Sequence, residues 1–127
     1  MSEVPDGLHY TESHEWIRIE GERAVVGITD YAQDALTDVV WVELADVGAK
    51  VGAMESCASV ESVKSVSEIY APVSGEIVES NEALEDTPEA INQDPYGGGW
   101  IFTLRMDDAS QVEGLLDAAT YSGLIGD

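Results

Sequence analysis

Hydrophobic and polar residues alternate near the start of the chain, which is the pattern of a half-buried β-strand. Over residues 14–20, Trp16 and Arg18 fall on one side of the predicted strand, and Glu15 and Ile17 fall on the other. A glycine and its polar neighbours then turn the chain, and residues 23–28 return as a second strand. The two segments together predict a β-hairpin.

Similar patterns recur through the rest of the chain. Residues 39–44 are apolar and β-branched enough for a core strand, and alternation returns over 100–105. Between them, Lys64 is flanked on both sides by strand patterns. Residues 71–75 predict a turn, because proline presets φ and glycine accepts a positive φ, and 76–79 resume as a strand. Short strands joined by such turns are typical of a mostly-β sandwich or small barrel.

Helices are expected only at the margins of this sheet structure. Residues 30–36 predict a short helix, opened by a capping box in which Asp30 accepts a backbone N–H. Residues 87–92 predict a further turn or two, with a threonine cap and a proline in the first turn. Ser110 and Glu113 form another capping box, which opens a C-terminal helix. The apolar face of that helix consists of Val112, Leu115, Leu116 and Ala119.

Composition limits the classes of function. The 127 residues are expected to form one domain, 1–127. The formal charge of −21 disfavours nucleic acid and anionic membranes as partners, and it favours proteins with basic docking faces. No apolar run approaches the length of a membrane span, and the acidic N-terminus is unlike a signal peptide. With a single cysteine, these features predict a soluble, cytoplasmic monomer.

Few residues suggest catalysis or metal binding. His9 and His14 are the only histidines, and there is no Cys-x-x-Cys motif, so no metal site is expected. Lys64 is one of only two lysines, and its predicted position is the tip of a hairpin. Such a lysine is either an ordinary solubilising residue or the attachment point of a long cofactor. Spacing alone leaves both interpretations open.

Longer motifs favour the second interpretation. The runs Glu61-Ser62-Val63-Lys64 and Ile69-Tyr70-Ala71-Pro72-Val73-Ser74-Gly75-Glu76-Ile77 resemble the lipoyl-attachment segment of glycine cleavage system H proteins. The resemblance continues in His14-Glu15-Trp16, Gly27-Ile28-Thr29-Asp30, Pro95-Tyr96 and Leu115-Leu116-Asp117-Ala118. It therefore covers nearly the whole chain.

The resemblance implies a fold and a role. The fold would be a lipoyl-domain-like barrel-sandwich hybrid with short peripheral and C-terminal helices. The role would be that of a non-catalytic carrier with lipoate joined covalently to Lys64. It would carry an aminomethyl group from a pyridoxal-phosphate glycine decarboxylase (P protein) to an aminomethyltransferase (T protein). A dihydrolipoyl dehydrogenase (L protein) would then reoxidise the dithiol, and a lipoylating enzyme would attach the cofactor.

The resemblance also implies two sets of site residues. Glu61, Gly48 and Gly75 would be recognised by the lipoylating enzyme. Ser13, Glu15 and Glu68 would line a cleft that shelters the loaded arm, in which a carboxylate pairs with the cationic amine. The chain departs from the family at two positions: Tyr31 stands where histidine is frequent, and Glu68 where aspartate is frequent.

Two other carrier functions are compatible with the same motifs. The chain could relay lipoate to 2-oxoacid dehydrogenase subunits, which the sequence does not separate from the first role. It could also be a biotin carrier, although biotinyl lysines usually sit between methionines, whereas Val63 and Ser65 flank Lys64.

Overall fold

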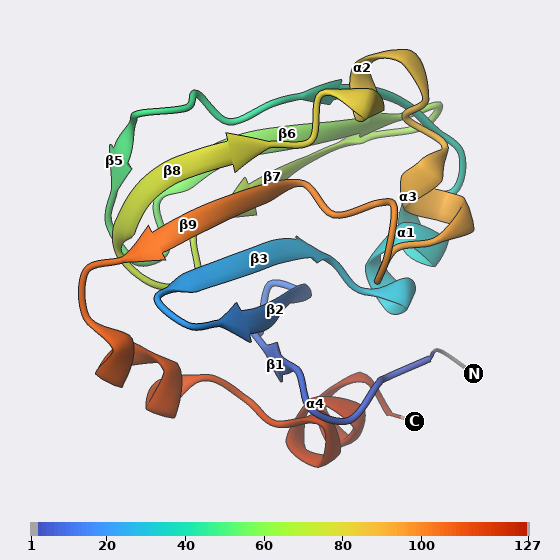
Figure 1. The fold of residues 1–127 in the computed structure, drawn as a ribbon. Helices are drawn as coiled ribbons and strands as arrows, with labels where there is room; N and C mark the ends of the chain where they lie inside the picture. The colour runs from blue at the N-terminus through green and yellow to red at the C-terminus, as the bar shows by residue number, and fades with distance from the viewer. Residues whose placement is uncertain (1–2, 127) are drawn as a thin grey trace.

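Two antiparallel sheets form the protein, and the computed structural model describes residues 3–126 (Figure 1). The larger sheet has the strand order β1-β2-β3-β9-β8-β5, and the smaller has the order β4-β6-β7. In chain order, the strands are β1 (His9–Tyr10), β2 (Glu15–Glu20), β3 (Arg23–Ile28), β4 (Val39–Glu43), β5 (Lys50–Val51), β6 (Ser56–Ser62), β7 (Val66–Tyr70), β8 (Gly75–Ser80) and β9 (Phe102–Met106). The mostly-β class predicted from the alternation is confirmed.

The main core fills the space between the two sheets. Val42, Val60 and Ile69 project into it from the smaller sheet, and Ile77 and Leu104 project into it from the larger sheet. All five side chains are buried. Each such side chain stabilises the fold by about 1.5–3 kcal/mol relative to exposure to water. This core fixes the smaller sheet, and with it the β6–β7 hairpin, on the rest of the protein.

A second apolar cluster covers the opposite face of β2. Tyr10 stacks on Tyr121 with ring centroids 4.8 Å apart, and Trp16 packs in the same cluster. The indole N–H of Trp16 donates a hydrogen bond to the carbonyl oxygen of Pro95 at 2.8 Å. Because Trp16 and Ile17 are both fully buried, β2 is covered on both faces at its start. The prediction of a half-buried strand is therefore wrong for this part of β2.

Short helices lie around the sheets. They are α1 (Asp30–Leu36), α2 (Ala83–Asp86), α3 (Ala90–Gln93), the 3₁₀ helix η1 (Ala109–Gly114) and α4 (Ala118–Ile125). In Figure 1, η1 and α4 run below β1 and β2, whereas α1 and α3 lie together at the end of the molecule toward which β3 and β8 point. The sequence patterns did not predict α2.

The helix starts differ from the predicted capping boxes. Thr29, whose backbone is extended, caps α1 by accepting a hydrogen bond from the N–H of Ala32 at 3.3 Å. Asp30 instead accepts the side-chain amide of Gln33 at 2.7 Å. At α3 the cap position is Glu89, and no side chain caps the helix, so the threonine cap predicted for residues 87–92 is wrong.

The predicted C-terminal helix is two helices. The chain is extended at Leu115, and Leu116 forms an isolated antiparallel bridge with Tyr10. Asp117 then caps α4 by accepting the N–H of Thr120 at 2.8 Å. A continuous helix would remove the backbone pairing of Leu116 with β1, and this pairing explains the break.

Candidate functional site

Lys64 lies in the tight turn between β6 and β7. The last strand pair before the turn is Glu61 with Val66. The backbone N–H of Ser62 donates to the carbonyl oxygen of Ser65 at 2.8 Å, which closes the loop. The tip predicted from the sequence is therefore where the structure places Lys64.

The hydroxyl of Ser62 organises this turn. Its oxygen accepts hydrogen bonds from the N–H groups of Lys64 at 3.3 Å and Ser65 at 3.1 Å. The N–H of Val63 donates to the carbonyl oxygen of Asp38 at 3.1 Å, which ties the tip to the segment before β4. These bonds fix the backbone of Lys64, while its side chain is exposed. Within residues 3–126 the ion pairs all involve arginine, so the Lys64 amine forms none.

A cavity of about 310 Å³ opens beside the turn. It lies between the end of the turn with the start of β7, which supply Ser65 and Val66, and α1, which supplies Ala32 and Leu36. Its remaining walls come from Ser13, His14, Ile28, Tyr31, Ala35, Ser67 and Ile69. The lining is mostly apolar with a few polar groups, which suits a flexible apolar chain attached at the neighbouring lysine.

His14 contributes to this cavity in a constrained conformation. Its φ of 69° lies in the left-handed region, which is uncommon for residues other than glycine. Its Nδ1 lies 2.9 Å from the hydroxyl of Tyr121, and its ring centroid lies 4.9 Å from that of Tyr31. Burial lowers the pKa of His14 below its ordinary value, so the ring is neutral at neutral pH. Sequence reasoning treated His14 as a possible metal ligand and as part of the His14-Glu15-Trp16 motif, but it did not assign His14 to the cleft, which its place beside Ser13 could have indicated.

Ser13 and Glu15 occupy different environments, although both were expected in the arm cleft. Ser13 lines the cavity beside Lys64, whereas Glu15 is fully buried and is not part of that lining. The Glu15 carboxylate accepts hydrogen bonds from the hydroxyl of Thr11 at 2.5 Å and from the backbone N–H of Tyr70 at 3.3 Å. Burial raises the pKa of Glu15, and these two hydrogen bonds partly oppose the increase.

Glu68, the third expected cleft residue, lies on the other side of β7. It is exposed and accepts a hydrogen bond from the hydroxyl of Ser56. With Glu43 and Glu55, it lines a separate cavity of about 350 Å³. The structure thus brings Ser13, but not Glu15 or Glu68, to the cavity beside Lys64.

The three residues expected to be recognised by the lipoylating enzyme are also dispersed. Glu61 is exposed on β6, three residues before Lys64. Gly48 turns the chain with φ 94°, and its N–H donates to the carbonyl oxygen of Ile77 at 2.7 Å. Gly75 begins β8, and β5 and the start of β8 lie at the end of the molecule opposite the β6–β7 turn (Figure 1).

The reason given for Gly75 from the sequence is wrong. Gly75 does not have a positive φ. A Cβ atom at this position would lie 2.3 Å from the carbonyl oxygen of Arg105, because β8 and β9 approach closely there. Glycine is therefore required for close backbone packing, and not for a turn.

Other kinds of site find little support in residues 3–126. No cluster of three or more His, Cys, Asp or Glu side chains there could hold a metal ion. None of the described helices is both long and apolar enough to cross a membrane. Cys57 is partly buried, and burial raises the pKa of its thiol to about 12, so it is not a thiolate nucleophile at neutral pH.

An exposed lysine on a braced hairpin tip thus lies beside a mostly apolar cavity, an arrangement that suits a carrier protein. The model of the family "Glycine cleavage H-protein" matches residues 8–127. The chain belongs to this family, and it is therefore the lipoyl carrier component of the glycine cleavage system and not one of its catalytic components.

Individual relatives support this membership over the full length. The chain is 54% identical to the glycine cleavage system H protein of Halorhodospira halophila, over 100% of this chain and 98% of that protein. It is 55% identical to the H protein of Aeromonas salmonicida, over 98% of each chain. A crystal structure of the H protein from Mycobacterium marinum is 44% identical and has a TM-score of 0.89, covering 98% of this chain and 100% of that one. The likeness confirms the lipoyl-domain-like fold.

Proposed function

We propose that the amine of Lys64 is the attachment point of lipoate. The main structural support is that Lys64 combines a fixed backbone with an exposed, unpaired amine at a hairpin tip. If attached there, lipoate would supply a redox-active dithiolane, the chemistry needed to carry an aminomethyl group between the glycine decarboxylase and the aminomethyltransferase and to exchange electrons with dihydrolipoyl dehydrogenase. Tethering raises the local concentration of the arm at each of these active sites.

The surroundings of Lys64 fit such a group. The hydroxyl of Ser62 holds the turn, so the lysine is presented in one orientation to the lipoylating enzyme. Glu61 lies close enough along β6 to be contacted in the same encounter, whereas Gly48 and Gly75 act through the fold that they permit. The cavity begins at Ser65 and Val66, directly after the lysine. An arm rooted on Lys64 can therefore turn back into it.

The cleft residues have different roles in this proposal. Ser13 offers a hydroxyl to the arm, and neutral His14 offers a ring nitrogen or N–H. Glu15 acts indirectly, because its carboxylate holds the backbone of Tyr70 at the end of β7. Glu68 faces the other side of β7 and would meet the arm only outside the cavity. Enclosing the arm limits the access of water to its reactive end.

The same proposal assigns the partners and the compartment. The partners are the P, T and L proteins and the lipoylating enzyme, which the chain meets as a monomer in the cytoplasm. The absence of a disulfide among residues 3–126, with Cys57 as a free thiol, is in accord with a reducing compartment. Membership of the H-protein family disfavours the biotin carrier, while a relay of lipoate to 2-oxoacid dehydrogenase subunits stays a prediction.

Reconstitution tests the function. The lipoylated protein, combined with the three purified enzymes and tetrahydrofolate, should support glycine-dependent release of CO₂. Lys64→Arg should abolish it, whereas Lys50→Arg, which changes the only other lysine, should leave it unchanged. Ser13→Ala should keep lipoylation but alter the rate of ammonia release in the absence of the aminomethyltransferase. CO₂ release supported by the Lys64→Arg variant would refute the proposal.

A further inference from the structure

The outer face of the β4-β6-β7 sheet carries apolar side chains that are exposed to solvent. Trp41 on β4 pairs with Glu61 on β6, which pairs with Val66 on β7, so the three side chains form one row across this face. Trp41 is 57% exposed and Val66 is 61% exposed. The neighbouring row, which contains Val42 and Val60, points into the core and is buried. Trp41 is therefore not required to fill the core.

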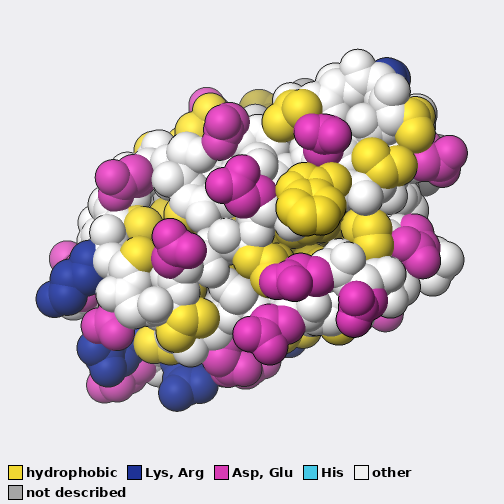
Figure 2. Space-filling view, turned by 90° about the horizontal axis from the view of Figure 1, so that it is seen from above, with side chains coloured by type: hydrophobic (Ala, Val, Ile, Leu, Met, Phe, Trp, Pro, Cys, Tyr) yellow, Lys and Arg dark blue, Asp and Glu magenta, His cyan; other side chains and the backbone are white. Residues whose placement is uncertain are grey.

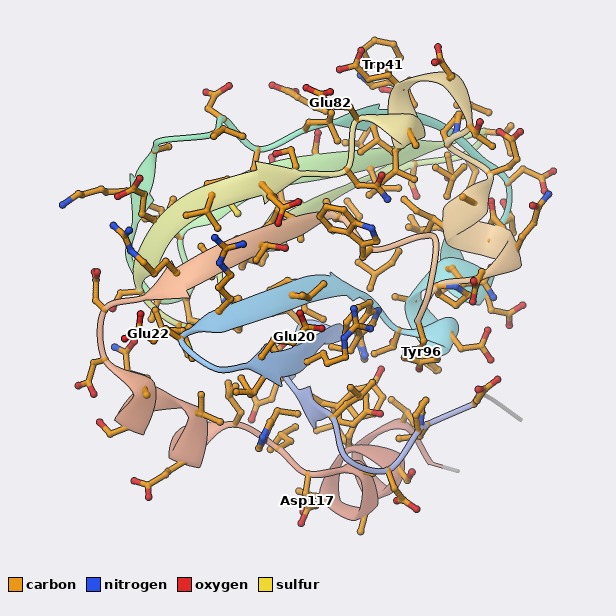
Figure 3. All side chains as sticks on the ribbon, viewed as in Figure 1. Glu20, Glu22, Trp41, Glu82, Tyr96 and Asp117 are labelled. Atoms are coloured by element: carbon orange, nitrogen blue, oxygen red, sulfur yellow. The ribbon has the colours of Figure 1, made fainter. Side chains whose placement is uncertain are left out.

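A groove beside Trp41 combines this aromatic surface with carboxylates. Its volume is about 500 Å³, and Trp41 forms one of its walls. The acidic residues in its lining are Glu43, Asp46, Glu82 and Glu85, and no basic side chain lines it. Figure 3 shows Trp41 standing out from the sheet near Glu82, and Figure 2 shows hydrophobic side chains with acidic side chains between them on the face seen from above.

This combination fits one kind of occupant. The face of an aromatic ring attracts a guanidinium or ammonium group, and the attraction increases when water is excluded. Four carboxylates around the same groove favour a cation there and repel an acidic surface. A second copy of this chain would bring a net charge of −21 against another −21, and nucleic acid would be repelled in the same way.

We propose that Trp41 and its groove form a docking surface for the partner enzymes, in which an arginine or lysine at the rim of an enzyme's active-site entrance packs on the indole. Tryptophan and arginine are among the residues most enriched in interface hot spots, and the rim around the buried centre of an interface is polar. Exposed Val63 and Val66 extend the apolar contact toward the tip of the hairpin.

The docking surface around Trp41 lies near Lys64, the proposed root of the arm. Glu61, the cross-strand partner of Trp41, is three residues from Lys64 on the same strand and turn. An enzyme bound at Trp41 would therefore have its entrance beside the root of the arm. This inference rests on the proposed function, because it requires that Lys64 delivers a group to those enzymes.

Binding of the unlipoylated protein tests the surface without the cofactor. Isothermal titration calorimetry would measure the Kd for each of the purified P, T and L proteins. Trp41→Ala should raise the Kd at least about tenfold for one or more of them, the loss typical of an aromatic hot-spot residue. Leu124→Ala is the matched control, because Leu124 is 50% exposed but lies on α4. Unchanged thermal melting of both variants would exclude an effect on folding.

Variants that neutralise the acidic side chains of the groove test whether the enzyme contacts it with a basic residue. Glu82→Gln/Glu85→Gln should weaken binding and flatten its salt dependence, whereas Glu12→Gln/Glu113→Gln, outside the groove, should do neither. A Kd that Trp41→Ala leaves unchanged for all three enzymes would overturn the inference. Mass analysis of Lys64 is the separate readout for the proposed function: an unlipoylated wild type would overturn that function and this inference together. A lipoylated wild type with unchanged Kd values for Trp41→Ala would overturn the inference alone.

Discussion

The carboxylate of Glu15 and the backbone N–H of Tyr70 form a hydrogen bond of 3.3 Å that joins the two sheets. Glu15 begins β2 in the larger sheet, and Tyr70 ends β7, an outer strand of the smaller sheet. The same carboxylate accepts a hydrogen bond from the hydroxyl of Thr11. A fully buried acid thus holds the strand that starts at the lysine-bearing turn.

This arrangement predicts an unusual pH dependence for Glu15. Because burial raises its pKa in the folded protein, the folded state retains a proton that the unfolded state has lost. The contribution of Glu15 to the free energy of unfolding therefore falls as pH rises from its ordinary pKa of 4.5 through the raised value. Glu15→Gln should remove this loss, so the variant should melt at a higher temperature than wild type at pH 7.

Melting temperatures measured across a pH series provide both the control for Glu15→Gln and the result that would contradict the prediction. The difference between Glu15→Gln and wild type should shrink as pH is lowered below 4.5, because both side chains are then neutral. Glu12→Gln, which changes an exposed neighbouring acid, should not show this convergence. A difference in melting temperature between wild type and Glu15→Gln that stays constant from pH 4 to pH 8 would contradict the raised pKa of Glu15.

The hydroxyl of Ser62 should matter more for lipoylation than for stability. Ser62→Ala removes the acceptor of the Lys64 and Ser65 N–H groups, at a cost of about 0.5–1.5 kcal/mol in the free energy of unfolding. We expect the variant to fold but to be lipoylated more slowly, because the lysine is no longer held in one orientation. Ser80→Ala, which loses a side-chain bond to Ala45 elsewhere, is the control. Equal rates for both variants in a timed mass assay would argue against a role for the turn.

Gly75→Ala should destabilise the protein through a backbone clash. The added methyl group would lie 2.3 Å from the carbonyl oxygen of Arg105, so β8 and β9 would have to separate. We expect a loss of about 1–3 kcal/mol in urea unfolding, as for other overpacked sites. At Gly114 the same change meets nothing within 4 Å, so Gly114→Ala should have little effect. A Gly75→Ala variant that is as stable as wild type but is not lipoylated would instead show direct recognition of Gly75.

The imidazole of His14 is expected to be neutral at neutral pH. Because burial lowers its pKa, the folded protein binds the His14 proton less readily than the unfolded chain does. The free energy of unfolding should therefore decrease as pH falls below the ordinary value of 6.5. A nuclear magnetic resonance titration of the imidazole should give a pKa below 6.5. A value above 6.5 would contradict burial as the main influence on the pKa of His14.

Strand patterns predicted most of the framework, because alternation reports directly which side chains face a core. The boundaries of β3 coincide with the predicted 23–28, and the strands on either side of Lys64 were also recognised. Burial of β2 on both faces was not predictable, since the second face is covered by Tyr121 of α4, far away in the sequence. The break at Leu116 has the same origin, because it depends on pairing with Tyr10.

The site was predictable only where it is local. Lys64 and the residues around it lie in one hairpin, so sequence motifs were sufficient to find the turn. The cavity combines α1, the segment at Ser13 and His14, and β7, which only the fold brings together. Glu68 differs from its expected place because it lines the separate cavity with Glu43 and Glu55, whereas Ser67 and Ile69 on either side of it line the cavity beside Lys64.

Mass analysis of the protein from a host able to attach lipoate tests the central claim most directly. Peptide mapping can distinguish the two possible sites, because Lys50 and Lys64 are the only lysines. We expect one lipoyl group per chain, on the peptide that contains Lys64, and none on Lys50 or in the Lys64→Arg variant. An unmodified Lys64, in a host that lipoylates other carriers normally, would contradict the assignment of Lys64 as the root of the arm.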